Sequence, residues 1–386
     1  MRILGIEIVA TTLKFRFSIA HASNTRKSDK VFFLILTSKD GLKGYGECHA
    51  RPYVTGETEE QVCACLTECI PLLTNADFEN PQKLISEIRA AIQFKSGGLG
   101  AMCAIDLAVH DLASQSIKIP ISELLDRSSS KANSTNTQMT AVYPLTKSGL
   151  MLCALNLVYR TYFRFTDIKV KGTGNLEIDR EYIRAIRSKS TEPLDIRIDL
   201  NESLPIAEAE RYFSEMSKRP TNISWFEQPF TKGDLASAAR YQKQFSSKIT
   251  LCADESLCTM EDLDRIIESN AFKAINIRIA KNGGLIQSLE LAQRAEAAGI
   301  QSQLGCLVGE TSLLSYAALH LAAAFPKFRY HEGCFARYLL KCDPARPSLG
   351  FSRGAIIKSS TLPPFGLAPV VRYDKLLEMN ESPTTQ

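Results

Sequence analysis

Four neighbouring segments of the chain carry charged side chains whose types and spacing suit metal and acid–base chemistry. Lys169 and Lys171 stand two residues apart in TDIKVKG, so on a strand they share a face. Asp199, Glu227 and Asp254 follow in DIRIDLN, ISWFEQP and ITLCADES. Three carboxylates suit a hard divalent cation, and a lysine beside such a cation loses its proton more readily. Together they predict a site that removes a proton from the carbon next to a carboxylate.

A repeat of strand and helix must position these residues. We expect eight short apolar strands, most of which end in charged residues and each of which is followed by a helix-like stretch. They lie at 140–145, 166–172, 195–201, 223–229, 249–256, 274–279, 300–306 and 328–333. Eight nearly regular units predict a closed barrel, in which catalytic groups lie at the C-terminal ends of the strands. An open doubly wound sheet also alternates strands and helices, but no G-x-G-x-x-G follows the first strand and no Walker A loop is present.

The rest of the chain predicts two further parts. Strands at 30–37 and 43–48 flank the turn KDG, and helical patterns follow at about 58–75, 80–95 and 100–117. We therefore expect an α+β domain over 1–130, a barrel domain over 131–354 and a tail over 355–386 that returns to the first domain. The polar stretch RSSSKANSTNTQ (127–138) is the expected connection between the two domains.

Composition argues against several classes of protein. The chain has 386 residues, 46 basic against 42 acidic side chains and a net charge of +4, without a basic run, so nucleic acid is not an expected partner. The longest apolar run, 313–325, is too short to cross a bilayer and predicts a buried helix. The start of the chain lacks the features of a signal peptide and reads as a strand. Eleven scattered cysteines fit a reducing compartment, so the expected location is the cytoplasm.

One group of cysteines raises the question of a metal site. Cys63, Cys65 and Cys69 lie close together in VCACLTEC. The segment has a helical pattern, contains no Cys-x-x-Cys pair and has no partner cluster elsewhere in the chain, so we interpret it as part of a helix.

Taken in order, the motifs KVKG, IDLN, WFEQP, CADES and NIRIAKNGG resemble the enolase superfamily, in its muconate-lactonizing and dipeptide-epimerase branch. The resemblance covers nearly the whole chain: GYGECHARPYVTGET (44–58) is similar to the family's capping loop, and AMCAIDLAVHDLAS (101–114) to the last helix before its barrel. It implies a modified (β/α)8 TIM-type barrel under an N-terminal α+β capping domain completed by the C-terminal tail. It also implies an essential Mg²⁺, with Mn²⁺ as an alternative, and a homo-oligomer.

The resemblance assigns roles to individual residues. Asp199, Glu227 and Asp254 would bind the metal, Lys171 would be the base, and Lys169 would assist it electrostatically. Residues expected to support the ligands are Asn201 and Gln228. Residues expected to contact a small carboxylate substrate are Arg26, His49, Arg51, Tyr53, His331 and Glu332, with a rim histidine of no chemical role as the other interpretation of His331.

Two departures from the family pattern bear on the reaction. The family usually has a lysine on the sixth strand opposite Lys171, where this chain has Arg278, and guanidinium is a poor general base. Strand parity places Lys281 on the opposite face from Arg278, so we interpret Lys281 as structural or solvated. On the eighth strand, YHEGC replaces the Asp-x-Asp that receives a substrate ammonium group in dipeptide epimerases, which weakens the dipeptide assignment.

The expected function is therefore abstraction of an α-proton from a small carboxylate, with net isomerisation of the cycloisomerase or racemase/epimerase type. In one-base chemistry, Lys171 moves the proton, and Arg278 orients the substrate or stabilises its negative charge. This arrangement favours cycloisomerisation or elimination over epimerisation without excluding epimerisation. The alternatives are a lyase on the same scaffold, of the dehydratase or succinylbenzoate-synthase type, and a barrel that has lost catalysis and serves as a binding protein.

Overall fold

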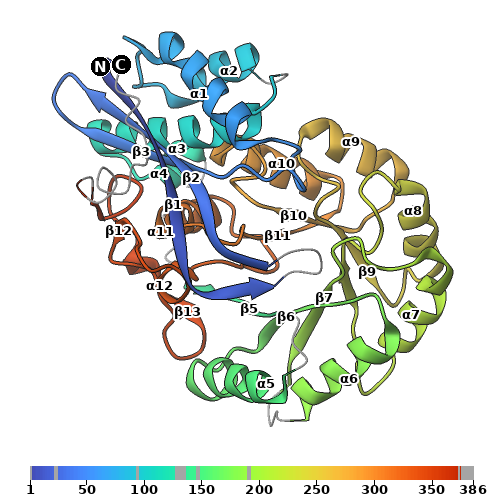
Figure 1. The fold of residues 1–386 in the computed structure, drawn as a ribbon. Helices are drawn as coiled ribbons and strands as arrows, with labels where there is room; N and C mark the ends of the chain where they lie inside the picture. The colour runs from blue at the N-terminus through green and yellow to red at the C-terminus, as the bar shows by residue number, and fades with distance from the viewer. Residues whose placement is uncertain are drawn as a thin grey trace.

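A long antiparallel hairpin opens the chain and leads into a helical cluster that lies beside a barrel (Figure 1). The computed structural model describes residues 2–20, 25–92, 95–126, 136–144, 148–188, 193–372 and 374. Residues 127–135, the main part of the expected connection between domains, lie outside this description, as does most of the last part of the tail.

Up to residue 126, the described residues form one antiparallel sheet and four helices. The sheet has the order β1-β2-β3, with strands Ile3–Ala20, Thr25–Ser38 and Lys43–Cys48. The helices are α1 Glu59–Leu73, α2 Pro81–Ile92, α3 Gly98–Ile117 and α4 Ile121–Leu125. Helix α3 packs directly on β3, where a Cβ added at Gly46 would lie 1.8 Å from the carbonyl oxygen of Ala104. Only glycine allows this close approach.

The barrel is a parallel sheet with the order β11-β10-β9-β8-β7-β6-β5. Its strands are β5 Ala141–Tyr143, β6 Asp167–Lys171, β7 Asp195–Asp199, β8 Trp225–Glu227, β9 Thr250–Ala253, β10 Ala274–Ile277 and β11 Gln301–Leu304. Each falls within a predicted strand. The sheet curls upon itself and helices cover its outer face (Figure 1), so the predicted capped barrel is confirmed.

The outer helices follow the strands in the alternating order that the sequence predicted. They are α5 Gly149–Asn156, which continues as a π-helix η1 over Leu157–Tyr162, then α6 Leu176–Arg187, α7 Ala209–Met216, α8 Leu235–Gln244, α9 Met260–Ser269, α10 Leu285–Ala297, α11 Ser312–Ala324 and α12 Ala336–Leu339. Polar caps fix where they start: Thr259 and Asp262 form a reciprocal capping box at α9, and Asn175 accepts two backbone N–H groups at α6. Helix α11 is the buried helix predicted at 313–325.

The eighth predicted strand, 328–333, is shorter than expected and forms only an isolated parallel bridge between His331 and Leu304. The segment nevertheless bonds both of its neighbours, because Leu304 N donates to Tyr330 O at 2.9 Å and Thr140 N donates to His331 O at 2.8 Å. These bonds join the β11 side of the sheet to the segment that precedes β5. The barrel therefore closes through a segment too short to count as a full strand.

The tail returns to the first domain, as predicted. Leu367 N donates to Asp111 Oδ1 at 2.8 Å and Gly366 N donates to Ser114 Oγ at 2.9 Å, both on helix α3. Strand β14 (Val370–Val371) then pairs with β12 (Ala345–Arg346). In the part of the chain described above, no helix is both long enough and apolar enough to cross a membrane.

Candidate active site

Three carboxylates meet at the C-terminal ends of adjacent barrel strands. Asp199 is the last residue of β7, Glu227 is the last residue of β8, and Asp254 follows the end of β9. One oxygen from each lies within 4.8 Å of the others, and all three side chains are buried. Among the described residues this is the group of His, Cys, Asp and Glu side chains that could hold a metal ion, while Cys63, Cys65 and Cys69 lie on α1 as predicted.

The three carboxylates fit a hard divalent cation. Oxygen ligands on three separate strands leave further coordination positions for water and substrate oxygens. Burial raises the pKa of Asp199, and the nearby negative charge of Glu227 raises it further. A bound cation would relieve this repulsion between like charges.

Lys169 lies beneath the carboxylates and is held as a cation. Its Nζ lies 3.1 Å from Glu227 Oε1, 2.6 Å from Glu332 Oε2 and 3.6 Å from Asp199 Oδ2. Burial by itself lowers the pKa of Lys169, but these carboxylates outweigh it and leave the pKa well above its ordinary value. Lys169 is therefore a fixed positive charge rather than a proton acceptor.

Lys171 contacts one of these carboxylates, Asp199, and is less buried than Lys169. Its Nζ lies 2.6 Å from Asp199 Oδ2 and 3.0 Å from Asn201 Oδ1. Its side chain is 14% exposed, whereas that of Lys169 is 2% exposed. Of the two lysines on β6, Lys171 is the one that a substrate entering from solvent can meet.

Glu227 is oriented by two amides, one on β10 and one on β11. Asn276 Nδ2 donates to Glu227 Oε1 at 2.8 Å, and Gln303 Nε2 donates to Glu227 Oε2 at 2.7 Å. The inward direction of Asn276 follows from strand parity, but the role of Gln303 was missed. The signal that could have found it is the second glutamine of IQSQL, in the middle of a predicted barrel strand where a buried residue is expected.

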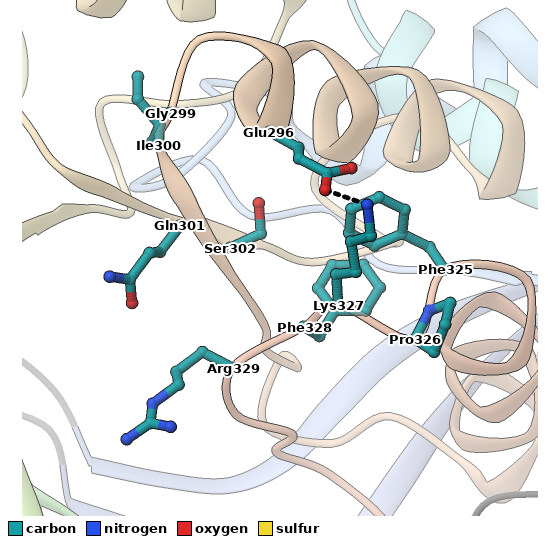
Figure 2. A pocket seen from close by; sticks show the side chains of 10 residues that line it. All are labelled: Glu296, Gly299, Ile300, Gln301, Ser302, Phe325, Pro326, Lys327, Phe328 and Arg329. Carbon is teal, nitrogen blue, oxygen red and sulfur yellow. Dashed lines mark hydrogen bonds and ion pairs between the residues drawn. The ribbon is translucent and has the colours of Figure 1, made fainter.

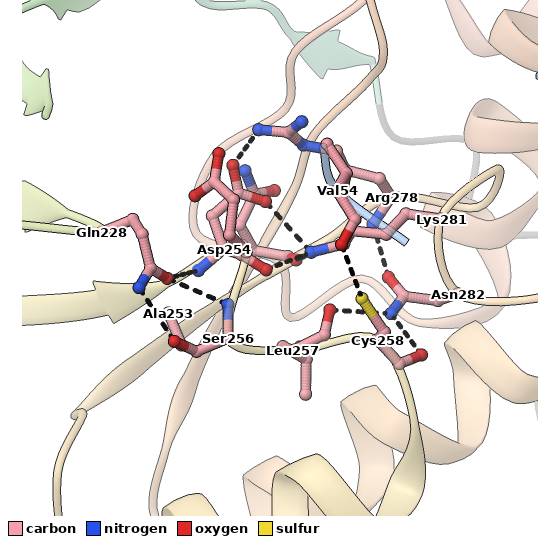
Figure 3. Close-up of polar contacts among 12 residues, drawn as sticks. Val54, Gln228, Ala253, Asp254, Ser256, Leu257, Cys258, Arg278, Lys281 and Asn282 are labelled. Carbon is pink, nitrogen blue, oxygen red and sulfur yellow. Dashed lines mark hydrogen bonds and ion pairs between the residues drawn. The ribbon is translucent and has the colours of Figure 1, made fainter. Parts of the chain in front are cut away.

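Arg278 and Lys281 both contact Asp254 (Figure 3). Arg278 Nη2 pairs with Asp254 Oδ2 and lies 3.7 Å from Glu227 Oε1. Burial lowers the pKa of Arg278, but Asp254, Glu255 and Glu227 raise it well above its ordinary value, so the guanidinium stays charged. Strand parity thus placed Arg278 correctly.

The prediction that Lys281 lies on the opposite face from Arg278 is wrong, and of its two interpretations, structural or solvated, the solvated one is wrong as well. Its side chain is fully buried, and its Nζ donates to Asp254 Oδ1 at 3.0 Å, to Asp254 O at 2.6 Å and to Asn276 O at 3.0 Å. Parity failed because β10 ends at Ile277. Beyond it the chain turns, with Lys281 N donating to Arg278 O at 2.9 Å, so alternation no longer applies.

Gln228 and Asn201 form hydrogen bonds around Asp254 and Asp199. Gln228 Oε1 accepts the backbone N–H groups of Asp254 at 2.9 Å and of Ser256 at 3.1 Å, which fixes the turn after β9 (Figure 3). Asn201 N donates to Asp199 Oδ1 at 3.1 Å, and Asn201 Nδ2 donates to Glu255 Oε1 at 3.1 Å. Asn201 thereby links the amine of Lys171 to Asp199 and Glu255.

The capping loop contributes a buried ion network. His49 bonds Asp29 and Glu47, each at 2.8 Å, and Arg51 donates to Asp29 at 2.7 Å and to Val308 O at 2.7 Å. The pKa of His49 is about 9, because the hydrogen bonds to Asp29 and Glu47 outweigh the lowering effect of burial. The bond from Arg51 to Val308 O ties the cap to the loop after β11, whereas both bonds of His49 stay within the cap. The structure thus gives both side chains partners other than the three carboxylates.

The other predicted substrate contacts occupy different places. Tyr53 is 54% exposed and lies under the guanidinium of Arg26, 5.1 Å from the ring centre, and Arg26 also pairs with Asp29 at 3.3 Å. His331 packs its ring 6.0 Å from that of Phe328, and burial lowers its pKa to about 4. It has the opposite strand parity from Glu332, which points into the barrel, so the structure does not bring His331 to the site.

The loop of the cap contacts the barrel next to the ends of the strands that carry the carboxylates. Val54 O accepts from Lys232 Nζ, in the segment after β8, at 3.4 Å. It also accepts from Cys258 Sγ, in the segment after β9, at 3.8 Å (Figure 3). A separate surface pocket between the end of α10 and residues 325–329 is shown in Figure 2. Gln301, at the start of β11, lines it, so that pocket lies at the opposite end of the strands.

The fold and the site together define a class: a capped parallel barrel with a carboxylate metal site at the C-terminal ends of its strands. Comparison with known proteins agrees. Residues 3–126 match the mandelate racemase / muconate lactonizing enzyme N-terminal domain, and residues 154–367 match the enolase C-terminal domain-like family. The chain belongs to the mandelate racemase / muconate lactonizing enzyme branch of the enolase superfamily.

Individual relatives are isomerases. The chain is 31% identical over 350 residues to an L-Ala-D/L-amino acid epimerase of Populus trichocarpa, covering 89% of this chain and 78% of that protein. It is 27% identical over 321 residues to an L-amino acid-D/L-Glu epimerase of Francisella philomiragia, covering 82% and 87%. A dipeptide epimerase of Cytophaga hutchinsonii, solved with Mg and the dipeptide D-Ala-L-Val, has a TM-score of 0.86 at 22% identity, covering 98% and 99%. The last likeness shows the fold.

Proposed function

We propose that this protein is a divalent-metal-dependent isomerase that abstracts the α-proton of a small carboxylate. One observation carries the proposal. The amine of Lys171, partly exposed at the ends of the strands, lies 2.6 Å from Asp199, which itself converges with Glu227 and Asp254. A proton acceptor thus stands beside a set of metal ligands, and the epimerase and racemase relatives carry out the same class of reaction.

Each residue of the site has a separate task in this proposal. A divalent cation held by Asp199, Glu227 and Asp254 would supply positive charge for the enediolate form of the substrate. Lys171 Nζ accepts the α-proton. Lys169, held as a cation by Glu227 and Glu332, adds a fixed positive charge that stabilises developing negative charge without moving a proton.

We propose Mg²⁺ as the cation, with Mn²⁺ as an alternative. The support is the all-carboxylate donor set and the Mg found with several dipeptide epimerases of this fold. Hard oxygen ligands suit both ions.

Arg278 bears on the stereochemical outcome. The resemblance to the family places it opposite Lys171, and Asp254 and Glu227 keep its guanidinium charged. A guanidinium in that setting orients the substrate or stabilises negative charge but does not act as a base. Lys171 then moves the proton alone, which suits a muconate-cycloisomerase-like reaction or a single-base epimerisation. A single base, with an arginine on the other side, also favours the second candidate function, a lyase of the dehydratase or succinylbenzoate-synthase type.

The proposal extends to the domains, the edge of the cap and the state of the protein. We place the cap at 1–130, the barrel at 131–354 and the tail at 355–386, with support from the bonds of Gly366 and Leu367 to helix α3. Arg26 and Tyr53 at the edge of the cap are proposed to meet the outer part of the substrate, and His49 and Arg51 to hold the loop that closes over it. A homo-oligomer in the cytoplasm is the proposed state.

Exchange of substrate hydrogen with solvent tests this function. The protein is incubated in heavy water with candidate N-acyl amino acids, dipeptides and other small carboxylates, with Mg²⁺ or with a chelator. We expect deuterium at the α-carbon of at least one candidate class, detected by NMR, only when Mg²⁺ is present. Absence of both exchange and Mg²⁺ binding would instead favour a barrel that has lost catalysis.

A further inference from the structure

A buried carboxylate of the cap meets the start of a barrel helix. Asp106, on α3, is fully buried, and its Oδ2 accepts the backbone N–H of Ile286 at 2.9 Å. Ile286 is the second residue of α10, and the N–H groups in the first turn of a helix have no partner within that helix. The residue before α10 is Gly284, which has no side chain to accept one of them. Asp106 therefore does from the cap what an N-cap side chain does within a helix.

Gly284 makes this close approach possible. A Cβ added at Gly284 would lie 2.5 Å from Asp106 Oδ2 and 2.6 Å from Asp106 Cβ, and the φ of Gly284 is +104°, which residues other than glycine rarely adopt. A Cβ added at Gly283 would lie 3.4 Å from Leu99 Cδ2, which also belongs to α3. The Gly-Gly pair of NIRIAKNGG thus forms part of the surface against which α3 packs.

The other oxygen of Asp106 is paired with a buried histidine. Its Oδ1 lies 2.6 Å from Nδ1 of His110, one turn further along α3, and both side chains are fully buried. Burial lowers the pKa of His110, but Asp106 outweighs burial and raises this pKa above its ordinary value. The pair fixes the direction of the carboxylate, so the oxygen that faces α10 is held in place.

The turn between β10 and α10 connects this contact with the metal site. Arg278 O accepts the backbone N–H of Lys281 at 2.9 Å, and Gly284 N donates to Ile279 O at 3.0 Å. The turn is therefore hydrogen-bonded up to the residue that precedes α10. Within it, Lys281 Nζ donates to Asp254 Oδ1 at 3.0 Å, and Arg278 pairs with the same carboxylate (Figure 3).

We propose that Asp106 is a positioning residue of the metal site. By fixing the start of α10 from the cap, it holds the turn that brings Lys281 and Arg278 against Asp254. The inference rests on the proposed function, because it concerns the metal site of that function. It gives the cap a part in metal binding, which Asp106 exerts through the turn and not as a ligand.

Three variants on α3 test this role. Asp106→Leu removes the acceptor for Ile286 N and replaces it with an apolar side chain of the same branched shape, whereas Asp106→Asn keeps an acceptor. Asp111→Leu is the matched control. Asp111 is also buried on α3 and accepts backbone N–H groups, but they belong to Tyr45 in the cap and to Leu367 in the tail.

Calorimetric titration with Mg²⁺ and thermal unfolding compare these variants with the wild type. We expect Asp106→Leu to bind Mg²⁺ about tenfold more weakly or worse, the loss typical of a residue that orients metal ligands. Since Asn and Asp are equivalent as helix caps, Asp106→Asn should stay within about threefold of the wild type. Asp111→Leu should unfold at a lower temperature and still bind Mg²⁺ within about twofold of the wild type, because it shares no partner with the turn.

Three results of this comparison would overturn the role of Asp106. The first is wild-type Mg²⁺ affinity in Asp106→Leu, and the second is an equal loss of affinity in Asp111→Leu. The third is an Asp106→Asn protein as weak as Asp106→Leu, which would assign the effect to the charge pair with His110 instead of the bond to α10.

A measurement on the unaltered protein does not depend on the folding of a variant. Coupling between two sites is reciprocal, so Mg²⁺ should in turn secure the bond between Asp106 and Ile286. Hydrogen exchange of single amides is followed by mass spectrometry with and without saturating Mg²⁺. Exchange of the Ile286 amide should slow by about tenfold, and that of the Leu367 amide, which Asp111 accepts, by less than about twofold. Equal slowing of the two amides would contradict the proposal.

The outcomes separate this role from the proposed function. If Mg²⁺ acts on the variants and amides as expected but no carboxylate exchanges its α-hydrogen, α-proton abstraction is wrong and the role of Asp106 stands. If substrates exchange while Asp106→Leu binds Mg²⁺ like the wild type, the role of Asp106 is wrong and the function stands. A wild-type protein that binds neither Mg²⁺ nor Mn²⁺ overturns both.

Discussion

Replacing Lys281 with methionine should weaken metal binding although Lys281 is not proposed as a metal ligand. The fully buried amine of Lys281 makes three contacts, to Asp254 Oδ1 at 3.0 Å, Asp254 O at 2.6 Å and Asn276 O at 3.0 Å. It therefore fixes both the side chain of one proposed ligand and the backbone of Asn276, whose amide orients Glu227. Methionine fills similar space and removes all three bonds.

The size of the effect follows from these contacts. Loss of a partner that orients a metal ligand typically weakens metal binding by about 10- to 100-fold. Breaking a buried ion pair by removing one member costs about 3–5 kcal/mol of stability, because the remaining charge is left uncompensated. Asp254 keeps its contact with Arg278, so we expect the lower end of both ranges.

Calorimetric titration with Mg²⁺ and thermal unfolding measure the two effects. The control is Lys273→Met, since Lys273 is an exposed lysine at the start of the same strand segment. Lys281→Met should bind Mg²⁺ about tenfold more weakly or worse and unfold at a lower temperature, while Lys273→Met should match the wild type. If Lys281→Met binds Mg²⁺ within twofold of the wild type, Lys281 does not position Asp254 and the reasoning fails.

Two further predictions concern His49 in the cap and Arg278 on the side of the substrate opposite Lys171. Because the pKa of His49 is about 9 in the folded chain against 6.5 as its ordinary value, its protonated ring stabilises the fold fully below pH 6.5, and this contribution is lost as pH rises through 9. At about 1.4 kcal/mol per pKa unit, this contribution to the free energy of unfolding amounts to roughly 3 kcal/mol. Thermal unfolding measured from pH 6 to pH 10 should therefore show a steeper loss of stability in the wild type than in His49→Gln. Parallel curves of unfolding temperature against pH for the two proteins would contradict the His49 network. Arg278→Lys should place a titratable amine opposite Lys171 and raise the rate of epimerisation relative to other outcomes. Chiral chromatography of the products measures this rate. An unaltered rate and unaltered stereochemistry would remove the support for one-base chemistry.

Much of the barrel and its site could be predicted from the sequence, because both depend on local patterns. Each described strand of the barrel falls within a predicted segment, and Lys171, Asp199 and Glu227 are the last residues of their strands. Alternation along β10 correctly placed Arg278 beside the carboxylates. Strand parity is sufficient wherever a residue lies on a strand or directly at its end.

Prediction failed where the outcome depended on turns or on distant partners. Lys281 lies beyond the end of β10, where a turn rather than alternation directs the side chain. Glu332 pairs with Arg197, 135 residues away in the chain. No local pattern reveals that the charge of Glu332 is compensated inside the protein. No local pattern reveals either that His49 bonds Asp29, 20 residues away, and Glu47 within the cap.

The central claim is that Lys171 removes the α-proton beside a metal held by three carboxylates. The most direct test measures α-deuterium incorporation in heavy water by Lys171→Ala with a substrate that the wild type exchanges, together with its Mg²⁺ affinity. We expect exchange to fall by at least about 100-fold, as general-base catalysis contributes at least that much, while Lys171→Ala still binds Mg²⁺. Full exchange in Lys171→Ala with Mg²⁺ bound would contradict the assignment of the base.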